Sequence, residues 1–162
     1  MLEAYEIAKR SGIPHKFVVC GRDVEKYAQD YRLEQIGLEN EVIFKGWVEQ
    51  EDLPGIYNNA DLYLYPTRIE AFPIPISEAM ACGCPIVTSR DAAFAEVAGD
   101  AAIFVDPENP ADIADGILRV ARDDQLKHKL RVKGVERSKN FSWEKCARET
   151  LGVIERLKLE RA

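Results

Sequence analysis

Residues 66–89 read PTRIEAFPIPISEAMACGCPIVTS, and this stretch decides the fold. An apolar strand, Leu62 to Tyr65, ends immediately before it, and a loop with two prolines then leads into a short helix predicted over Ser77 to Ala81. A glycine ends that helix, and a second apolar strand follows at Ile86 to Thr88. Strand, proline-stiffened loop, helix and strand in this order predict a compact βαβ unit with parallel strands.

Further apolar runs alternate with helical patterns on both sides of this unit. Strands are predicted over His15 to Cys20, Glu41 to Lys45, Asp61 to Tyr65, Ile86 to Thr88 and Ala101 to Val105. Helices are predicted over Met1 to Ser11, Val24 to Gln35, Gln50 to Asn59, Ser77 to Ala81, Ala93 to Val97, Ala111 to Arg122, Asp124 to Lys139 and from Ser142 onward. Continuous apolar strands are typical of a parallel sheet that is buried on both faces. We therefore expect one Rossmann-like α/β domain over residues 1–162, with a parallel sheet of about five strands covered by helices and a helical C-terminal tail.

Composition narrows the classes of function. The chain has 162 residues, 46% of them hydrophobic, which suits one domain with a proper core. The formal net charge of −6 leaves no basic face for nucleic acid. No run reaches the roughly 20 apolar residues of a membrane span, and the N-terminal residues do not resemble a signal peptide. The four cysteines are expected to be small buried hydrophobes in a reducing compartment, and with two histidines no metal site is expected.

Two carboxylates are the most informative chemistry in the chain. Glu70 lies in the loop and Glu78 in the following helix, so we expect them to flank a cavity at the carboxyl end of a parallel strand. Ionised carboxylates accept hydrogen bonds from vicinal sugar hydroxyls, and free N–H groups at a helix start near Ile76 would suit a phosphate. A nucleotide sugar fits this combination. The alternative is that Glu78 is favoured by the helix dipole alone and Glu70 is an exposed loop acid.

Two other α/β families lack support. No G-x-G-x-x-G motif follows any predicted strand, which argues against a dinucleotide-dependent dehydrogenase. A receiver domain needs an aspartate at the tip of its third strand, where this chain has Pro66 and Thr67.

Residues 70–86 read E-A-F-P-I-P-I-S-E-A-M-A-C-G-C-P-I. They resemble the signature of retaining glycosyltransferases of the two-domain GT-B fold, whose usual form is E-G-F-G-x-P-x-x-E-A-M-A-x-G-x-P-V. Further matches follow in order along the chain: Gly46-Trp47-Val48, Ala60-Asp61, Glu96 to Ala102, Val105-Asp106-Pro107 and Phe141-Ser142-Trp143. The resemblance implies the C-terminal, donor-nucleotide-binding half of a hexosyltransferase, either a mannosyl- or a glucosyltransferase.

The resemblance also implies roles for individual residues. Glu70, the catalytic candidate, would accept hydrogen bonds from the donor sugar, and Glu78 would accept them from the ribose. The main chain of Phe72, Pro73 and Ile74 would face the sugar and the nearest phosphate. Pro73 replaces a usual glycine and has no N–H to donate.

The nucleotide side of the implied site comes from two earlier loops. Trp47 and Val48 would meet the base through main-chain atoms, and Gly21 and Arg22 would line the same cleft. No metal and no cofactor are implied, because enzymes of this fold neutralise the diphosphate with basic side chains and a helix dipole. Arg22 is one candidate for that charge, whereas Arg68 is close enough in sequence to pair with Glu70.

The family's C-terminal domain opens with a strand and a G-R…K segment, preceded by an acceptor-binding domain, and this sequence starts at the helix that follows them. We therefore expect a donor domain that binds a nucleotide-diphosphate sugar and is inactive alone, completed by an N-terminal acceptor-binding domain that would transfer the sugar to a glycan, lipid or protein. The alternatives are a non-catalytic nucleotide-binding subunit completed by a separate chain, and a fragment of a nucleotide-sugar epimerase.

Two further expectations concern surfaces. An uncovered strand edge or helix face would allow the domain to self-associate. The last helix, Ser142 to Arg161, carries apolar residues at near-helical spacing and would either reach the partner domain or pack on its own sheet. The implied location is cytoplasmic, at the inner face of the membrane where the other half provides the attachment.

Overall fold

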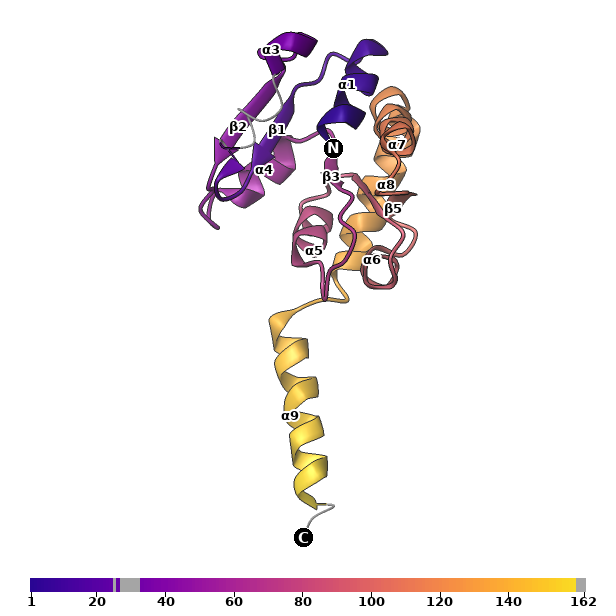
Figure 1. Cartoon of the computed structure of the whole chain (residues 1–162). Helices are drawn as coiled ribbons and strands as arrows, with labels where there is room; N and C mark the ends of the chain where they lie inside the picture. The colour runs from indigo at the N-terminus through magenta and orange to yellow at the C-terminus, as the bar shows by residue number, and fades with distance from the viewer. Residues whose placement is uncertain (25, 27–32, 160–162) are drawn as a thin grey trace.

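The computed structural model describes residues 1–24, 26 and 33–159 (Figure 1). Its helices and strands alternate along the chain, as predicted. They are α1 (Leu2–Arg10), β1 (Phe17–Cys20), α3 (Leu33–Ile36), β2 (Val42–Gly46), α4 (Leu53–Asn59), β3 (Tyr63–Tyr65), α5 (Ile74–Ala81), β4 (Ile86–Ser89), α6 (Ala92–Ala98), β5 (Ala102–Val105), α7 (Pro110–Arg122), α8 (Asp124–Ser138) and α9 (Trp143–Leu159). Most of the helix predicted over Val24 to Gln35 lies outside the described residues.

The five predicted strands are present and all pair in parallel, but they form two sheets instead of one. β1 pairs with β2, and β4 lies between β3 and β5. The prediction of a single sheet was therefore wrong. Neighbouring strands of one parallel sheet lie about 4.8 Å apart. In the described residues, no strand pairs with both β1 and β3 and so joins the two sheets. Among the described residues, β1 and β3, like β2 and β5, therefore each have one open edge.

The three-stranded sheet is covered by helices on both faces. Along β4 every residue is buried, and successive side chains enter different clusters: Ile86 packs with α5 and α6, whereas Val87 packs with α7. Helix α7 lies very close to the sheet at Gly116, where an added Cβ would stand 2.8 Å from a methyl group of Val105. This part of the chain matches the prediction of strands buried on both faces.

The two-stranded sheet is packed differently. Exposure alternates along β1, and Val18 and Ile43 keep 46% and 44% of their surface in solvent. Continuous apolar sequence therefore did not imply burial on both faces here. In the described residues, the inward face of this sheet belongs to the same buried cluster as side chains of α1, α3 and α7.

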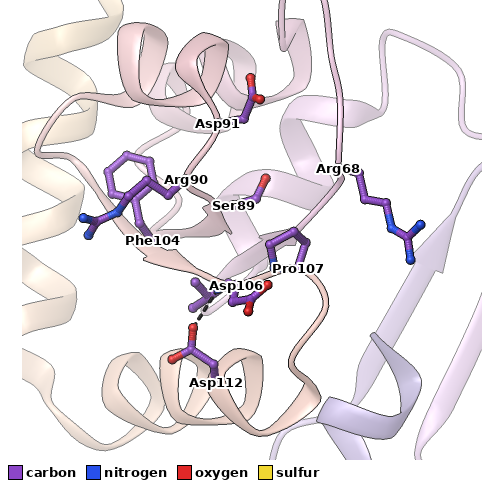
Figure 2. Close-up of a pocket in the computed structure, with 9 residues that line it drawn as sticks. Arg68, Ser89, Arg90, Asp91, Phe104, Asp106, Pro107 and Asp112 are labelled. Carbon is purple, nitrogen blue, oxygen red and sulfur yellow. Dashed lines mark hydrogen bonds between the residues drawn. The ribbon is translucent and has the colours of Figure 1, made fainter.

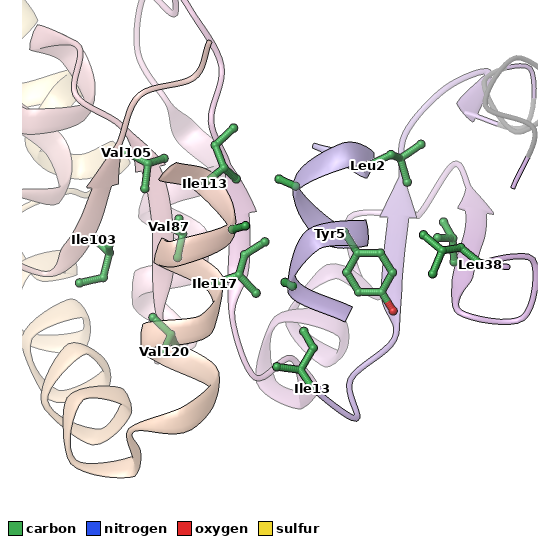
Figure 3. Packing of buried hydrophobic residues seen from close by; sticks show 14 of the residues in the cluster. Leu2, Tyr5, Ile13, Leu38, Val87, Ile103, Val105, Ile113, Ile117 and Val120 are labelled. Carbon is green, nitrogen blue, oxygen red and sulfur yellow. The ribbon is translucent and has the colours of Figure 1, made fainter. Parts of the chain in front are cut away.

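Helix α1 joins the two sheets (Figure 3). Leu2, Tyr5 and Ala8 are buried in the same cluster as Val42 of β2 and Ile117 of α7. The Tyr5 hydroxyl also donates toward two main-chain oxygens that precede β1 and β2, at 2.9 Å from His15 O and 3.2 Å from Glu41 O. Helix α1 therefore packs between the two sheets and connects them.

Helix α9 projects away from the rest of the molecule (Figure 1). Its cap is as predicted, because the Lys145 N–H donates to Ser142 Oγ at 3.1 Å. Trp143, Leu151 and Leu157 are 76%, 55% and 50% exposed, so the alternative in which α9 packs on its own sheet is wrong. Among the described residues, no helix has the length and apolar character needed to cross a membrane.

Candidate functional site

The loop after β3 enters α5 through two prolines. The helix begins at Ile74, three residues before the predicted Ser77, and buried Pro73 is the residue that precedes it. The N–H of Ile76 donates to Pro73 O at 3.0 Å, and that of Ile74 donates to Phe72 O at 2.9 Å. The expectation of free N–H groups near Ile76 was therefore wrong, since the earlier start pairs them locally and Pro75 has none. A phosphate contact from Ile74 would require its turn to open.

Glu70 is half-buried and is held by the strand that leads to it. The Tyr65 hydroxyl donates to Glu70 Oε2 at 3.1 Å. Burial raises the pKa of the Tyr65 phenol, and the hydrogen bond to Glu70 and the charge of Glu70 raise it further. The phenol therefore keeps its proton at neutral pH and acts as a donor.

Arg68 does not pair with Glu70, contrary to the sequence prediction. Its guanidinium forms two contacts with Glu108, with Nη2 2.7 Å from Oε2 and Nε against Oε1. Arg68 follows β3 and Glu108 follows β5, so both lie at the carboxyl-terminal end of the same parallel sheet. The charge of Arg68 is therefore already matched.

Glu78, on the first turns of α5, is held by helix α4. The Tyr57 hydroxyl donates to Glu78 Oε2 at 3.3 Å. Burial raises the pKa of this phenol most, followed by the charge of Glu78 and the hydrogen bond to it. Glu78 therefore faces a protonated donor in the same way as Glu70.

The two tyrosines belong to one aromatic group. Tyr63 lies edge-on to Tyr57, with ring centroids 5.3 Å apart, and stacks on Tyr65 at 5.6 Å with 16° between the planes. Glu70 and Glu78 are thus connected through three packed rings. Sequence reasoning did not assign these tyrosines to the site, although residues 63 and 65 must share one face of a strand and Tyr57 lies on the preceding helix.

The predicted nucleotide side is assembled at the carboxyl ends of β1 and β2. The Gly21 N–H donates to Gly46 O at 2.9 Å, and the Arg22 guanidinium lies 4.9 Å from the centre of the Trp47 ring. Trp47 is 58% exposed, and its Nε1 donates to Glu49 at 3.1 Å. Val48 continues this loop toward α4, the helix that carries Tyr57.

The structure therefore brings the predicted residues together as two groups. Glu70, Phe72, Pro73, Ile74 and Glu78 belong to the loop and helix α5, whereas Gly21, Arg22, Trp47 and Val48 belong to the two-stranded sheet. Within the described ranges, no hydrogen bond, ion pair or ring contact connects the groups directly. Within the same ranges, no cluster of three or more His, Cys, Asp or Glu side chains is placed to hold a metal ion.

A cavity of about 470 Å³ opens beside the loop, at the carboxyl ends of β3, β4 and β5 (Figure 2). Its lining includes Arg68 and Arg90, whose side chains point in opposite directions. All three of its aspartates bind local main chain: Asp91 accepts from the Ala93 N–H at 3.1 Å, Asp106 from the Glu108 N–H at 2.9 Å, and Asp112 from the Asp106 N–H at 2.6 Å. Neither Glu70 nor Glu78 lines this cavity, so it is not the one that they were expected to flank.

Comparison with known proteins gives consistent relatives. The family model described as "Glycosyl transferases group 1" matches residues 1–137. The chain is 38% identical over 114 residues to the O-antigen chain mannosyltransferase B of Escherichia coli, a match covering 70% of this chain and 30% of that protein. It is 34% identical over 127 residues to the mannosylfructose-phosphate synthase of Agrobacterium fabrum, covering 76% of this chain and 28% of that protein.

Solved structures show the same fold. The sucrose-phosphate synthase of Thermosynechococcus elongatus superimposes with a TM-score of 0.84 at 23% identity, over 99% of this chain and 43% of that one. HepE of Anabaena, in complex with UDP and glucose, superimposes with a TM-score of 0.81 at 20% identity, over 95% of this chain and 44% of that one. The chain spans about 30% of the length of the curated relatives above.

Proposed function

This chain belongs to the group 1 glycosyltransferase family and has the α/β fold of a GT-B C-terminal domain, and we propose that it is the donor-binding half of a retaining hexosyltransferase. The observation that carries the proposal is the pair Glu70 and Glu78. Both carboxylates are half-buried in the loop–helix segment that follows the carboxyl end of β3, and each accepts a hydrogen bond from a tyrosine. Open α/β sheets bind their ligands at this end.

Each of the two carboxylates binds a different part of the donor. Glu70 accepts hydrogen bonds from hydroxyls of the sugar, and Glu78 accepts them from the ribose. In each case Oε2 receives the phenol and Oε1 stays available for a ligand hydroxyl. Phe72 presents main chain to the sugar and the nearest phosphate from the same loop.

The base is proposed to lie against the loop that follows β2. Trp47 and Val48 contact it through main-chain atoms, and Gly21 with Arg22 closes the neighbouring side. The placement of Arg22 over the Trp47 ring supports this arrangement, since it keeps a cation beside the nucleotide. The donor is a nucleotide-diphosphate sugar, and the reaction uses no metal or further cofactor.

Binding and turnover are separate properties in this proposal. Arg68 is neutralised by Glu108, and the N–H groups of Ile74 and Ile76 are paired within their own turn. In this loop, little charge is thus left to stabilise a departing diphosphate, and Arg22 is the cation proposed to lie beside the nucleotide. We propose that a second domain supplies the acceptor site and the missing positive charge, and that the open edges of β1 and β3 take a further strand or self-associate.

The same observation favours a second candidate function, a nucleotide-binding subunit that does not itself catalyse transfer. The two candidates differ in what happens when a partner domain is present. Addition of an acceptor-binding domain should produce sugar transfer in the first case and tighter nucleotide binding without transfer in the second. A radiolabelled transfer assay distinguishes them.

Calorimetric titration with UDP, GDP and ADP tests the site itself. We expect at least one nucleotide to bind at up to millimolar concentration, and Glu78→Gln to weaken it by about tenfold, equivalent to the loss of one hydrogen bond to a charged group. The matched control is Glu96→Gln, an exposed acid on α6. No binding of any of the three nucleotides, or equal affinities for Glu78→Gln and the parent chain, would refute the proposed site.

A further inference from the structure

The two carboxylates of the proposed donor site share an arrangement that ordinary packing does not require. Each receives one phenolic hydrogen bond on Oε2, from Tyr65 at 3.1 Å for Glu70 and from Tyr57 at 3.3 Å for Glu78. The two tyrosines come from different elements, β3 and α4, yet both direct a hydroxyl to a carboxylate of the loop–helix segment. Phenylalanine would fill the same space without making either bond.

The rings that carry these hydroxyls are held in place by their neighbours. Tyr65 stacks on Tyr63 and also meets Phe94 edge-on at 6.1 Å, while Tyr57 packs edge-on against Tyr63. Phe94 is completely buried and Tyr57 is 8% exposed. A hydroxyl on a packed ring has few orientations available to it. Its hydrogen bond therefore restricts the orientation of the carboxylate that accepts it.

We propose that Tyr65 and Tyr57 are positioning residues of the donor site, with Tyr65 orienting Glu70 toward the sugar and Tyr57 orienting Glu78 toward the ribose. The inference rests on the proposed function, because it assigns the two tyrosines to the two ends of the same donor. It goes further by predicting that their effects separate: one hydroxyl controls recognition of the sugar and the other controls recognition of the nucleotide.

The direction of each hydrogen bond supports orientation over proton transfer. Burial raises the pKa of both phenols above the ordinary tyrosine value, so they remain donors throughout the neutral range. A phenol that donates to Oε2 leaves Oε1 as the acceptor that a ligand hydroxyl meets. Neither tyrosine needs to touch the reacting atoms.

The test uses Tyr65→Phe and Tyr57→Phe in the full chain, with UDP, UDP-glucose, GDP and GDP-mannose as probes. Tyr57→Phe should weaken a nucleotide and its sugar conjugate equally, by about three- to tenfold, the range expected for one hydrogen bond. Tyr65→Phe should weaken the sugar conjugate by a similar factor and leave the free nucleotide unchanged. The matched control is Tyr5→Phe in α1, which removes a hydroxyl that donates to the main-chain oxygens of His15 and Glu41 and should change no affinity.

A second readout does not depend on ligands. In carbon-detected NMR, the side-chain carboxyl signal of Glu70 should shift in Tyr65→Phe and stay in place in Tyr57→Phe, and the Glu78 signal should show the opposite pattern. A purely structural role for the hydroxyls would instead disturb both carboxyl signals together, or neither, and Tyr65→Phe would then weaken the free nucleotides as much as their sugar conjugates. Either of these patterns would overturn the inference.

Glu70→Gln and Glu78→Gln, measured with the same probes, distinguish the two levels of the proposal. If the glutamine variants lose affinity while both tyrosine variants match the parent chain, the positioning role is wrong and the donor site stands. If the glutamine variants bind every probe as the parent does, or no probe binds the parent chain, the donor site fails and the positioning role fails with it.

Discussion

The two sheets of this molecule are both built from apolar strands, but they have different surroundings. In the three-stranded sheet, β4 is buried along its whole length between α7 on one face and α5 with α6 on the other. In the two-stranded sheet, Val18 and Ile43 are nearly half exposed. An apolar run thus reports that a strand has formed, whereas the helices around it decide how deeply it is buried.

This difference also divides the proposed site. Glu70 and Glu78 are attached to the well-packed sheet through Tyr65 and Tyr57, so their geometry is fixed by the core. Arg22 and Trp47 extend from the less covered sheet, where Trp47 is 58% exposed. We expect the sugar and ribose contacts to be rigid and the base contacts to adjust.

The largest expected effect compares a buried helix residue that packs on the three-stranded sheet with a half-exposed strand residue of the two-stranded sheet. Phe94→Ala removes a completely buried ring and should lower the free energy of unfolding by about 3–5 kcal/mol, because a cavity remains behind it. Val18→Ala should cost less than about 1 kcal/mol, since nearly half of its side chain is already in water. Urea denaturation followed by circular dichroism measures both, and equal losses would remove the distinction between the sheets.

A smaller effect tests the close approach of α7 to the three-stranded sheet. At Gly116 an added Cβ would stand 2.8 Å from Val105 Cγ1 and 2.9 Å from Val87 Cγ1, so Gly116→Ala should destabilise the fold by about 1–3 kcal/mol. The control is Gly152→Ala on α9, where nothing lies within 4 Å. There the better helix propensity of alanine should leave stability unchanged or raise it by up to about 1 kcal/mol. A neutral Gly116→Ala in the same thermal or urea titrations would contradict the described packing.

The burial of Tyr5, on helix α1 between the two sheets, predicts that the stability of the fold falls at alkaline pH. Burial, then the charge of Glu41, raises the pKa of Tyr5 to about 12 from an ordinary value of 10.0, although a main-chain hydrogen bond at Phe17 lowers it. A raised pKa in the folded state contributes stability that is complete below pH 10 and is lost as the pH rises toward 12. The parent chain should therefore lose on the order of 1–2 kcal/mol more than Tyr5→Phe across this interval. Parallel losses in urea titrations of the two proteins would show that Tyr5 does not link α1 to the strands.

The smallest expected effect concerns the ion pairs of Asp61. They lie before β1 and β3, at the end of the strands opposite to the proposed site. Asp61, just before β3, lies 3.0 Å from Lys127 Nζ of α8 and 3.4 Å from His15 Nε2, which precedes β1. Burial alone would raise the pKa of Asp61, but the hydrogen bond and charge of Lys127, with His15 and Arg131, hold it below the ordinary value. The stability that these pairs contribute should disappear as the pH falls through this lowered pKa.

Because Asp61 is about half exposed, its pairs should contribute less than about 1 kcal/mol. Asp61→Asn should reduce stability by this amount at pH 7 and low salt, and the difference should shrink at high salt. A salt-independent loss of several kcal/mol would mean that the carboxylate has another role.

The sequence was sufficient for local structure and for the family. Parallel strands, alternating helices and the cap at Ser142 follow from periodicity and nearby residues, and all were confirmed. The early start of α5 could have been read from Pro73 and Pro75, since proline favours a first helical turn. The prediction placed the helix later because it treated both prolines as loop residues.

The remaining differences depend on contacts between distant residues. Arg68 and Glu108 are 40 residues apart, and only the arrangement of β3 and β5 in one sheet brings them together. The open edges of β1 and β3 likewise depend on which strands pair, and no local pattern encodes that. The tyrosine–carboxylate bonds combine both cases: the positions of Tyr65 on a strand and Tyr57 on a helix were readable, whereas their hydrogen-bond partners were not.

The most direct test of the account follows the indole N–H signals of its two tryptophans during titration with UDP or GDP. Trp47 lies in the proposed nucleotide site, whereas Trp143 lies on the projecting helix α9, so each chain contains its own control. We predict a saturable shift of the Trp47 signal, no shift of the Trp143 signal, and a weaker Trp47 response at the same nucleotide concentration in Glu78→Gln. A response confined to Trp143, or no response of Trp47 at millimolar nucleotide, would contradict the account.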